Sequence, residues 1–204
     1  MEGGNHMAGT QTKTGYLKGC RGLILTPLNP DGSMPTTPEK HAIKTSQSVA
    51  VELETVEGES GELRGGDRVL ARFEEHDVVV GANLTFTDAR FDAQAAQIIG
   101  GGTVITDEMD LTKIIGWKAP KIDEQGTRIP FQCEVYVANY NSSGGLDGYL
   151  KYTFTYCIGY ALGIEHQDQE WGTPEFEIRA RENPATGEPY VSKVFVDQLP
   201  AELQ

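Results

Sequence analysis

The chain has 204 residues and a formal net charge of −13, from 30 Asp and Glu against 17 Lys and Arg. This acidity argues against a nucleic-acid-binding surface, which needs a basic footprint. No apolar run approaches the roughly 20 residues of a membrane-spanning helix, and the N-terminus MEGGNHMAGT lacks the apolar core of a secretory signal. Three widely separated cysteines indicate reduced thiols in a cytosolic setting.

The chain is predicted to consist of two parts. Residues 1–40 are predicted to form an N-terminal arm, partly irregular, in which Gly22–Thr26 is one short strand stopped by Pro27. Residues 41–204 are predicted to form a single β domain. The content of 24 Gly and 10 Pro indicates many turns, which favours an antiparallel β architecture.

Period-two alternation predicts strands at Ser48–Glu57, Val69–His76, Asp77–Thr87 and Pro174–Arg181. Further strands are predicted at Thr103–Ile105, Phe131–Asn139, Tyr149–Tyr160 and Tyr190–Val196, and Lys113–Pro120 is expected to lead into another. Two polar, glycine-containing segments are predicted as loops, Glu57–Asp67 and Asn139–Gly148. In Pro174–Arg181, the alternation predicts that Phe176 and Ile178 face inward.

One short helix is predicted after the strand that ends at Thr87. Asp88 or Asp92 can cap it, because a short carboxylate accepts hydrogen bonds from the first free N–H groups. Phe91, Ala95, Ile98 and Ile99 share one face of that helix. Gly100–Gly102 then stops it, and the absence of a following Gly-Lys-Ser/Thr argues against a phosphate loop. We expect this helix to plug one edge or opening of a β structure.

No pattern of catalytic or metal-binding residues stands out. His6, His41, His76 and His166 share no metal spacing, so no metal or cofactor site is predicted. Cys133 and Cys157 are predicted to lie in the core. Acidic residues surround two of the histidines, and we interpret both groups as solvated loops rather than acid–base pairs: Glu165, Asp168 and Glu170 near His166, and Glu74, Glu75 and Asp77 near His76. No enzymatic activity is predicted.

The order and spacing of several segments resemble a bacteriophage major tail protein, the subunit of the tail tube. The resemblance rests on Gly65–Arg68, Leu84–Asp88 with Phe91, the helix ending at Ile98–Gly101, Tyr152–Gly159 and Pro174–Ala180. It spans roughly residues 40–200, and no single motif in it is diagnostic. Residues 1–40 lie outside it.

The resemblance implies a mainly β fold of two packed antiparallel sheets, sandwich or barrel-like, with one short flanking helix. It also implies a homo-oligomer: hexameric rings that stack into a tube, with strands of all subunits closing one barrel around a lumen. The implied partners are tape-measure and other tail proteins, and DNA that passes through without specific binding. The implied location is the virion tail, with assembly in the host cytoplasm and no membrane.

Two groups of residues carry hypotheses within this reading. The lumen wall is predicted to consist of Ser48–Glu57, Val69–His76, Asp77–Thr87 and Tyr149–Ile158. The polar faces of the first two, with Glu52, Glu54, Arg72 and Glu74, give a negative field that lets DNA slide without sticking; the alternative is that these acids only face bulk solvent. The apolar faces opposite, with Val49, Val51, Leu53, Val69, Ala71 and Phe73, are predicted to pack toward the second sheet. The two polar loops are predicted to form ring-to-ring contacts through Glu59, Glu62, Arg64, Asn141 and Ser143.

Two other classes of function stay open. One is a carbohydrate-binding or adhesive β-sandwich, which would usually show exposed aromatic residues on loops and a secretion signal. The other is a hydrolase that uses a carboxylate pair on a β scaffold. Electron microscopy separates the tail-tube reading from both, since only a tube protein should give rings or filaments.

Overall fold

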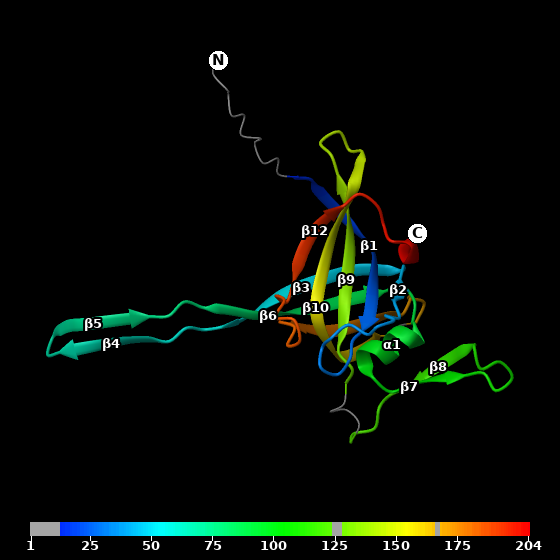
Figure 1. Cartoon of the computed structure of the whole chain (residues 1–204), viewed down its shortest axis with the longest axis horizontal. Helices are drawn as coiled ribbons and strands as arrows, with labels where there is room; N and C mark the ends of the chain where they lie inside the picture. The colour runs from blue at the N-terminus through cyan, green and yellow to red at the C-terminus, as the bar shows by residue number, and fades with distance from the viewer. Residues whose placement is uncertain (1–12, 124–127, 166–167) are drawn as a thin grey trace, which may run out of the picture.

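A large antiparallel sheet organises the computed structural model, which describes residues 13–123, 128–165 and 168–204. Two small hairpins and one short α-helix accompany it in these residues (Figure 1). The elements are β1 (Tyr16–Pro27), β2 (His41–Ile43), β3 (Ser46–Val56), β4 (Ser60–Gly65), β5 (Arg68–Glu74), β6 (Val78–Asp88), α1 (Ala93–Gly100), β7 (Thr103–Thr106), β8 (Ile114–Lys118), β9 (Phe131–Tyr140), β10 (Leu146–Glu165), β11 (Thr173–Arg181), β12 (Ser192–Val196) and the 3-10 turn η1 (Ala201–Leu203). The chain is therefore mainly β, as predicted.

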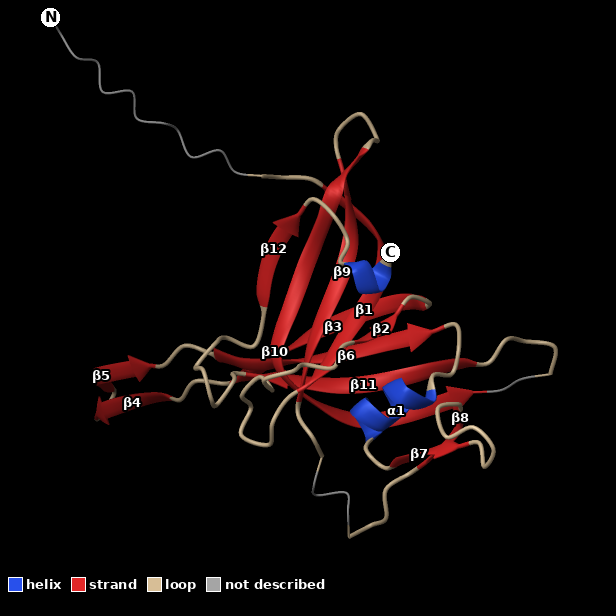
Figure 2. Cartoon of the chain, turned by 45° about the vertical axis from the view of Figure 1, so that its right-hand side comes forward, coloured by secondary structure: helices blue, strands red, loops and turns tan. Residues whose placement is uncertain are grey.

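The 20-residue strand β10 belongs to both halves of this sheet. Its first half lies between β9 and β12, and its second half, from Tyr156, pairs with β11. A register shift between Phe154 and Cys157 marks the change of partner. Figure 2 shows β1, β9 and the first half of β10 running across the direction of β3, β6 and β11. The predicted pair of packed sheets is thus one continuous sheet whose two layers share β10.

The hydrophobic core fills the space between the two layers. Aromatic rings from neighbouring strands meet there: Phe86 of β6 and Phe176 of β11 stack with their centroids 4.7 Å apart. Phe176 and Ile178 are almost completely buried, which confirms their predicted inward orientation. The other fully buried large side chains include Leu23, Leu25, Leu84, Ile99, Phe131 and Phe154.

The predicted helix is confirmed, with Asp92 rather than Asp88 as its cap. The Asp92 carboxylate accepts hydrogen bonds from the N–H groups of Gln94 and Ala95, at 2.9 and 3.1 Å. Gly101 ends the helix at φ 73°, which glycine adopts without a Cβ clash. One expectation is wrong: Phe91 precedes the helix and is 41% exposed, because the chain is still extended at the cap.

Helix α1 covers one opening of the folded sheet and packs closely on β10. Its buried face consists of Ala95, Ala96 and Ile99. A Cβ at Gly159 of β10 would overlap the carbonyl of Ile99, so the contact requires glycine there. The helix therefore packs directly against the sheet at β10.

The predicted arm of residues 1–40 contains a strand of the sheet. β1 pairs with β9 along most of its length, and Leu23, Ile24 and Leu25 are fully buried. The division at residue 40 therefore separates strands of one sheet. Register shifts on either side of Cys20 break the alternation on which strand prediction depends, and for this reason the sequence shows only the last part of β1.

The predicted loop Glu57–Asp67 is also corrected. Ser60–Gly65 forms β4, which pairs with β5 as a hairpin that projects from the body (Figure 1). The expectation that Val69, Ala71 and Phe73 pack toward a second sheet is wrong, since every residue of β5 is exposed. Pairing of β4 with β5 supplies backbone hydrogen bonds without a hydrophobic core, so the polar sequence of β4 did not reveal it.

The cysteines are unpaired thiols. Cys133 and Cys157 are fully buried, which confirms their predicted place in the core. Burial raises the pKa of both thiols above the ordinary value, which makes them unreactive at neutral pH. No helix in the described part of the chain is long and apolar enough to cross a membrane.

Candidate assembly surface

Two strand edges of the four-stranded layer lack a strand partner within the described residues. This layer consists of the second half of β10 with β11, β6 and β3, in that order. At one end β3 pairs only with β6, and at the other end residues 158–165 of β10 pair only with β11. An open edge presents unpaired backbone N–H and C=O groups and is a template for another strand.

The strand directions in this layer suit edge-to-edge joining of identical copies. Each neighbouring pair is antiparallel, so that β10 and β3, the first and last of four strands, run in opposite directions. A rotation that forms a ring preserves strand direction relative to the ring. The β3 edge of one copy therefore meets the β10 edge of the next in antiparallel orientation, and the alternation continues through the junction.

Arg128 occupies part of the β10 edge. Its Nη1 group donates hydrogen bonds to the carbonyl oxygens of Gly159 and Tyr160, the latter at 2.9 Å. The guanidinium also lies 5.7 Å from the centre of the Tyr160 ring. A strand that pairs with β10 at this point has to displace Arg128 from both carbonyls.

The outer face of the four-stranded layer is polar and carries both signs of charge. Register places Glu52 and Arg179 on either side of Asn83, and Glu54 and Arg181 on either side of Gly81. Glu54 forms an ion pair with Arg181 at 2.5 Å, and Arg179 lies 3.9 Å from the same oxygen. Counting Glu175 and Glu177, which alternate with buried residues of β11, four acids and two arginines leave this face with a net charge of −2.

The structure divides the four residues predicted to line a lumen. Glu52 and Glu54 lie together on the polar face of β3. Arg72 and Glu74 lie instead on β5, in the projecting hairpin, where they form an ion pair at 3.7 Å. They share no sheet with the other two, because the pairing of the chain changes at His76 and Asp77.

The projecting hairpin is amphipathic. Its register places Glu62 opposite Arg72, and Arg64 binds Glu62 at 3.0 Å, so charged side chains satisfy one another on one face. Leu63 lies opposite Ala71 on the other face. Leu63 and Phe73 are 63% and 52% exposed, so the apolar face has no cover in a single chain.

The residues predicted for ring-to-ring contacts lie in two separate places. Glu62 and Arg64 belong to β4, and Glu59 immediately precedes that strand. Asn141 and Ser143 lie in the turn between β9 and β10, where the Asn141 side chain accepts hydrogen bonds from Ser143 and Gly145. In both views this turn extends upward while the hairpin extends sideways (Figures 1 and 2).

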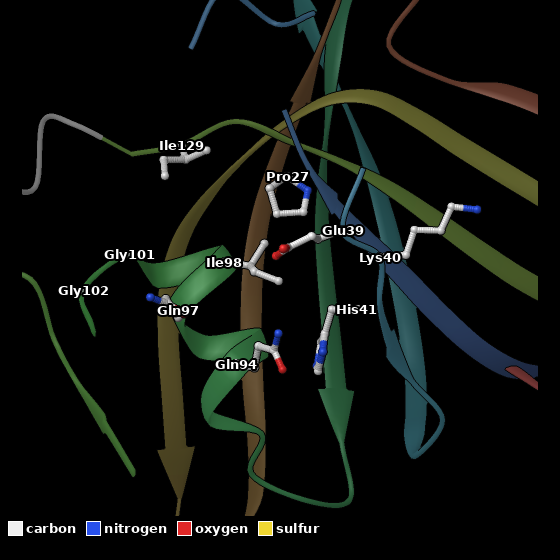
Figure 3. A pocket seen from close by; sticks show the side chains of 10 residues that line it. All are labelled: Pro27, Glu39, Lys40, His41, Gln94, Gln97, Ile98, Gly101, Gly102 and Ile129. Carbon is white, nitrogen blue, oxygen red and sulfur yellow. The ribbon is translucent and has the colours of Figure 1, made fainter. Parts of the chain in front are cut away.

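A small pocket of about 340 Å³ lies between α1 and the segment that leads into β2. Figure 3 shows Gln94 and Ile98 of the helix on the side of Glu39 and His41, while the Lys40 side chain points away from the helix. His41 Nε2 lies 3.0 Å from the Asp92 carboxylate. This contact, with smaller contributions from the backbone N–H groups of Ala95 and Gln94, lowers the pKa of Asp92 to about 2.

The described residues contain no group of three His, Cys, Asp or Glu side chains that could hold a metal ion. His76 and its acidic neighbours Glu74, Glu75 and Asp77 are exposed. Asp168 and Glu170 are exposed too, while His166 and the side chain of Glu165 lie outside the described part of the structure. In the pair His41–Asp92 beside α1, the Asp92 carboxylate is already engaged as the cap of the helix.

Sequence reasoning missed three arginines of this surface. Arg179 and Arg181 lie in the segment Glu-Phe-Glu-Ile-Arg-Ala-Arg, whose alternation places all four charges opposite the buried side chains. The same alternation that predicts the burial of Phe176 and Ile178 also predicts a charged face on this strand. For Arg128 the sequence shows no signal, since it contacts the β10 edge 31 and 32 residues further along the chain.

Comparisons with known proteins assign no family. No protein-family model matches the chain, and no curated protein matches it. One match among solved structures is a chain of the cryo-EM structure of the anti-feeding prophage baseplate, 6-fold symmetrised. The alignment covers 91% of this chain and 97% of that chain, with 10% sequence identity and a TM-score of 0.34. At these values the match fixes neither family nor function, and the tail-tube family stays a prediction.

Proposed function

We propose that this protein is a structural subunit of a phage tail tube, which self-assembles into hexameric rings that stack around a conduit for DNA. The observation that carries the proposal is the four-stranded layer with two open edges and a polar outer face. Joined through β3 and β10, copies of this layer close a continuous antiparallel barrel and leave no edge exposed. The number six and the stacking come from the resemblance to major tail proteins.

In this proposal the polar face of the layer lines the lumen. Glu52 and Glu54 of β3 lie on that face with Arg179 and Arg181, and its net charge of −2 per subunit repeats around the ring. Tight binding of DNA needs basic contacts that release counterions. A mildly negative wall instead repels the phosphate backbone, which suits passage without retention during ejection.

The proposal assigns ring-to-ring contacts to the hairpin and to the β9–β10 turn. Glu59, Glu62 and Arg64 reach outward with the hairpin, and Asn141 and Ser143 lie at the tip of the turn. Tape-measure and other tail proteins are the expected partners, the virion tail the expected location, and no catalytic role is assigned.

Electron microscopy of the purified full chain tests the proposal. Sedimentation velocity across a concentration series should show monomers giving way to large assemblies. Micrographs of the same samples should show rings or tubes of constant diameter. A chain that stays monomeric throughout the series, or that forms closed dimers only, contradicts it. A carbohydrate-binding or hydrolytic module should give no rings or tubes.

A further inference from the structure

An open apolar groove lies between the two layers of the sheet, at the side where β3 and β12 face each other. Its volume is about 510 Å³. Aliphatic and aromatic side chains of β3, β9, β10 and the segment before β12 line it: Val51, Leu53, Val135, Val137, Tyr152 and Tyr190. Val51 and Leu53 are 45% and 58% exposed, so the core of the fold opens into this groove.

The hairpin β4–β5 carries the complementary feature. Its apolar face carries Leu63, Ala71 and Phe73, all of which are exposed among the described residues, whereas the opposite face holds the ion pairs Arg64–Glu62 and Arg72–Glu74. An exposed apolar face rimmed by charges is typical of a protein contact. Every copy carries one groove and one hairpin, so each hairpin has one groove to occupy on another copy.

We propose that the apolar face of the hairpin of one copy docks in the apolar groove of a second copy. This inference rests on the proposed self-assembly and names the surface that receives the hairpin. The contact is heterologous, because a hairpin meets a groove rather than another hairpin. Such contacts propagate from copy to copy instead of closing a two-fold dimer.

A copy cannot readily fill its own groove with its own hairpin. The pairing of β3 with β6 continues to Val56 opposite Val78, directly at the root of the hairpin. Both views show the hairpin projecting away from the body from that root (Figures 1 and 2). The occupant therefore has to come from another molecule.

Charge favours the hairpin as that occupant. Residues 57–77 contain seven acidic residues against three arginines, a net charge of −4. The charged side chain that lines the groove is basic: Lys193 of β12, whose Nζ lies 5.4 Å from the centre of the Tyr152 ring. An acidic hairpin edge thus meets a basic rim, while Leu63 and Phe73 meet the aliphatic floor.

Disulfide cross-linking between two different variants tests the docking. Cys20→Ser removes the partly exposed native thiol, and the other two native thiols are buried. Leu63→Cys is then introduced into a copy that carries a mass tag, and Leu53→Cys into an untagged copy. Both positions are exposed, so folding should be preserved, which circular dichroism checks. Leu111→Cys, at a 76% exposed leucine in the loop between β7 and β8, is the matched control.

Mixing the Leu63→Cys and Leu53→Cys copies under mild oxidation should give a mixed-mass dimer several-fold above the level of either with Leu111→Cys. A mixed-mass band no stronger than that control overturns the proposal, whether or not the copies associate. A double variant that cross-links within one chain and stays monomeric overturns it in favour of the chain's own hairpin.

Electron microscopy of the same mixtures separates this inference from the proposed tube. Rings or tubes without the mixed-mass band overturn the docking and leave the tube proposal standing. The band without rings or tubes supports hairpin docking and contradicts the tube.

Discussion

Asp92 has two roles at the start of α1. Its carboxylate caps the helix through the N–H groups of Gln94 and Ala95, and it also contacts His41 of β2 at 3.0 Å. The contact ties the helix to the edge of the sheet next to β1. The lowered pKa of Asp92, about 2 against an ordinary 3.8, reflects mainly the hydrogen bond with His41.

We expect Asp92→Ala to reduce the free energy of unfolding by about 2 kcal/mol and Asp92→Asn by about 1 kcal/mol, because asparagine keeps the cap and loses the charge. Because the folded pKa is depressed, the stabilisation is complete above pH 3.8 and is lost as the pH falls toward about 2. Denaturant unfolding of the three proteins, measured at neutral pH and across this acid range, checks it.

The Asp92→Asn protein should approach the wild-type stability at the acid end of that range, since the wild-type carboxylate is then protonated. A constant difference between the two at every pH would show that the contact with His41 carries no charge-dependent stability.

Glu52 and Glu54 differ in their neighbours and should respond differently to reversal of charge. Glu54 binds Arg181 directly, so Glu54→Lys places a third cation beside Arg179 and Arg181. We expect it to reduce stability by about 1 kcal/mol. Glu52→Lys should stay within about 0.5 kcal/mol of wild type. Thermal unfolding at low and high salt measures the difference in stability loss between the two variants, and screening by salt should reduce this difference. If Glu54→Lys and Glu52→Lys lose the same stability at every salt concentration, the assigned ion pair is contradicted.

For single residues, the sequence predicts features that depend on neighbouring positions, but not contacts between residues far apart in the chain. The cap at Asp92 follows from its position before a helical pattern, and the burial of Phe176 and Ile178 follows from alternation. The partner of Glu54 lies 127 residues away along the chain. Its identity depends on the register of two intervening strand pairs, which no local pattern specifies.

The hairpin β4–β5 is an element that the folded body does not need. It forms its own two-stranded sheet and contributes no residue to the core. Replacing residues 58–76 with a two-residue Asn-Gly turn should leave the unfolding midpoint of the body within a few degrees of wild type. The same variant should fail to assemble.

Differential scanning calorimetry and sedimentation velocity on this one variant check both expectations. A large loss of stability would show that the hairpin supports the body. Tubes of normal length would show that the hairpin is no interface.

Arg128 protects the β10 edge in the single chain and should slow assembly through that edge. We expect Arg128→Ala to lower the concentration at which assemblies appear, because the carbonyls of Gly159 and Tyr160 become free to accept hydrogen bonds from a neighbouring strand. Light scattering across a concentration series measures that threshold. Arg128→Lys, which keeps the charge but loses the planar guanidinium, is the matched control. A threshold that rises or does not move in Arg128→Ala would contradict edge-to-edge joining at β10.

Most elements were predictable because their residues alternate or follow a helical period. β3, β6 and β11 each contain a stretch of alternating residues, and β9 and the first part of β10 are rich in β-branched and aromatic residues. β1 was seen only in part because bulges around Cys20 shift the alternation, and β4 was missed because its pairing buries nothing. Three-residue β2 offers too short a pattern for any sequence reading.

For the whole molecule, the net charge of −13 and the polar outer face of the four-stranded layer agree with a conduit that does not retain DNA. In the proposed assembly, the continuous sheet would let one chain contribute both a layer of a shared barrel and a second layer that covers it. β10 belongs to both layers and carries buried core residues, so a shift of its free edge would also move residues of the core.

The most direct measurement is a cryo-EM reconstruction of the assembled particle. We expect rings in which β3 of each subunit pairs antiparallel with the second half of β10 of the next, with Glu52 and Glu54 facing the lumen. A particle with both strand edges unpaired, or with Glu52 and Glu54 on its outer wall, would contradict it.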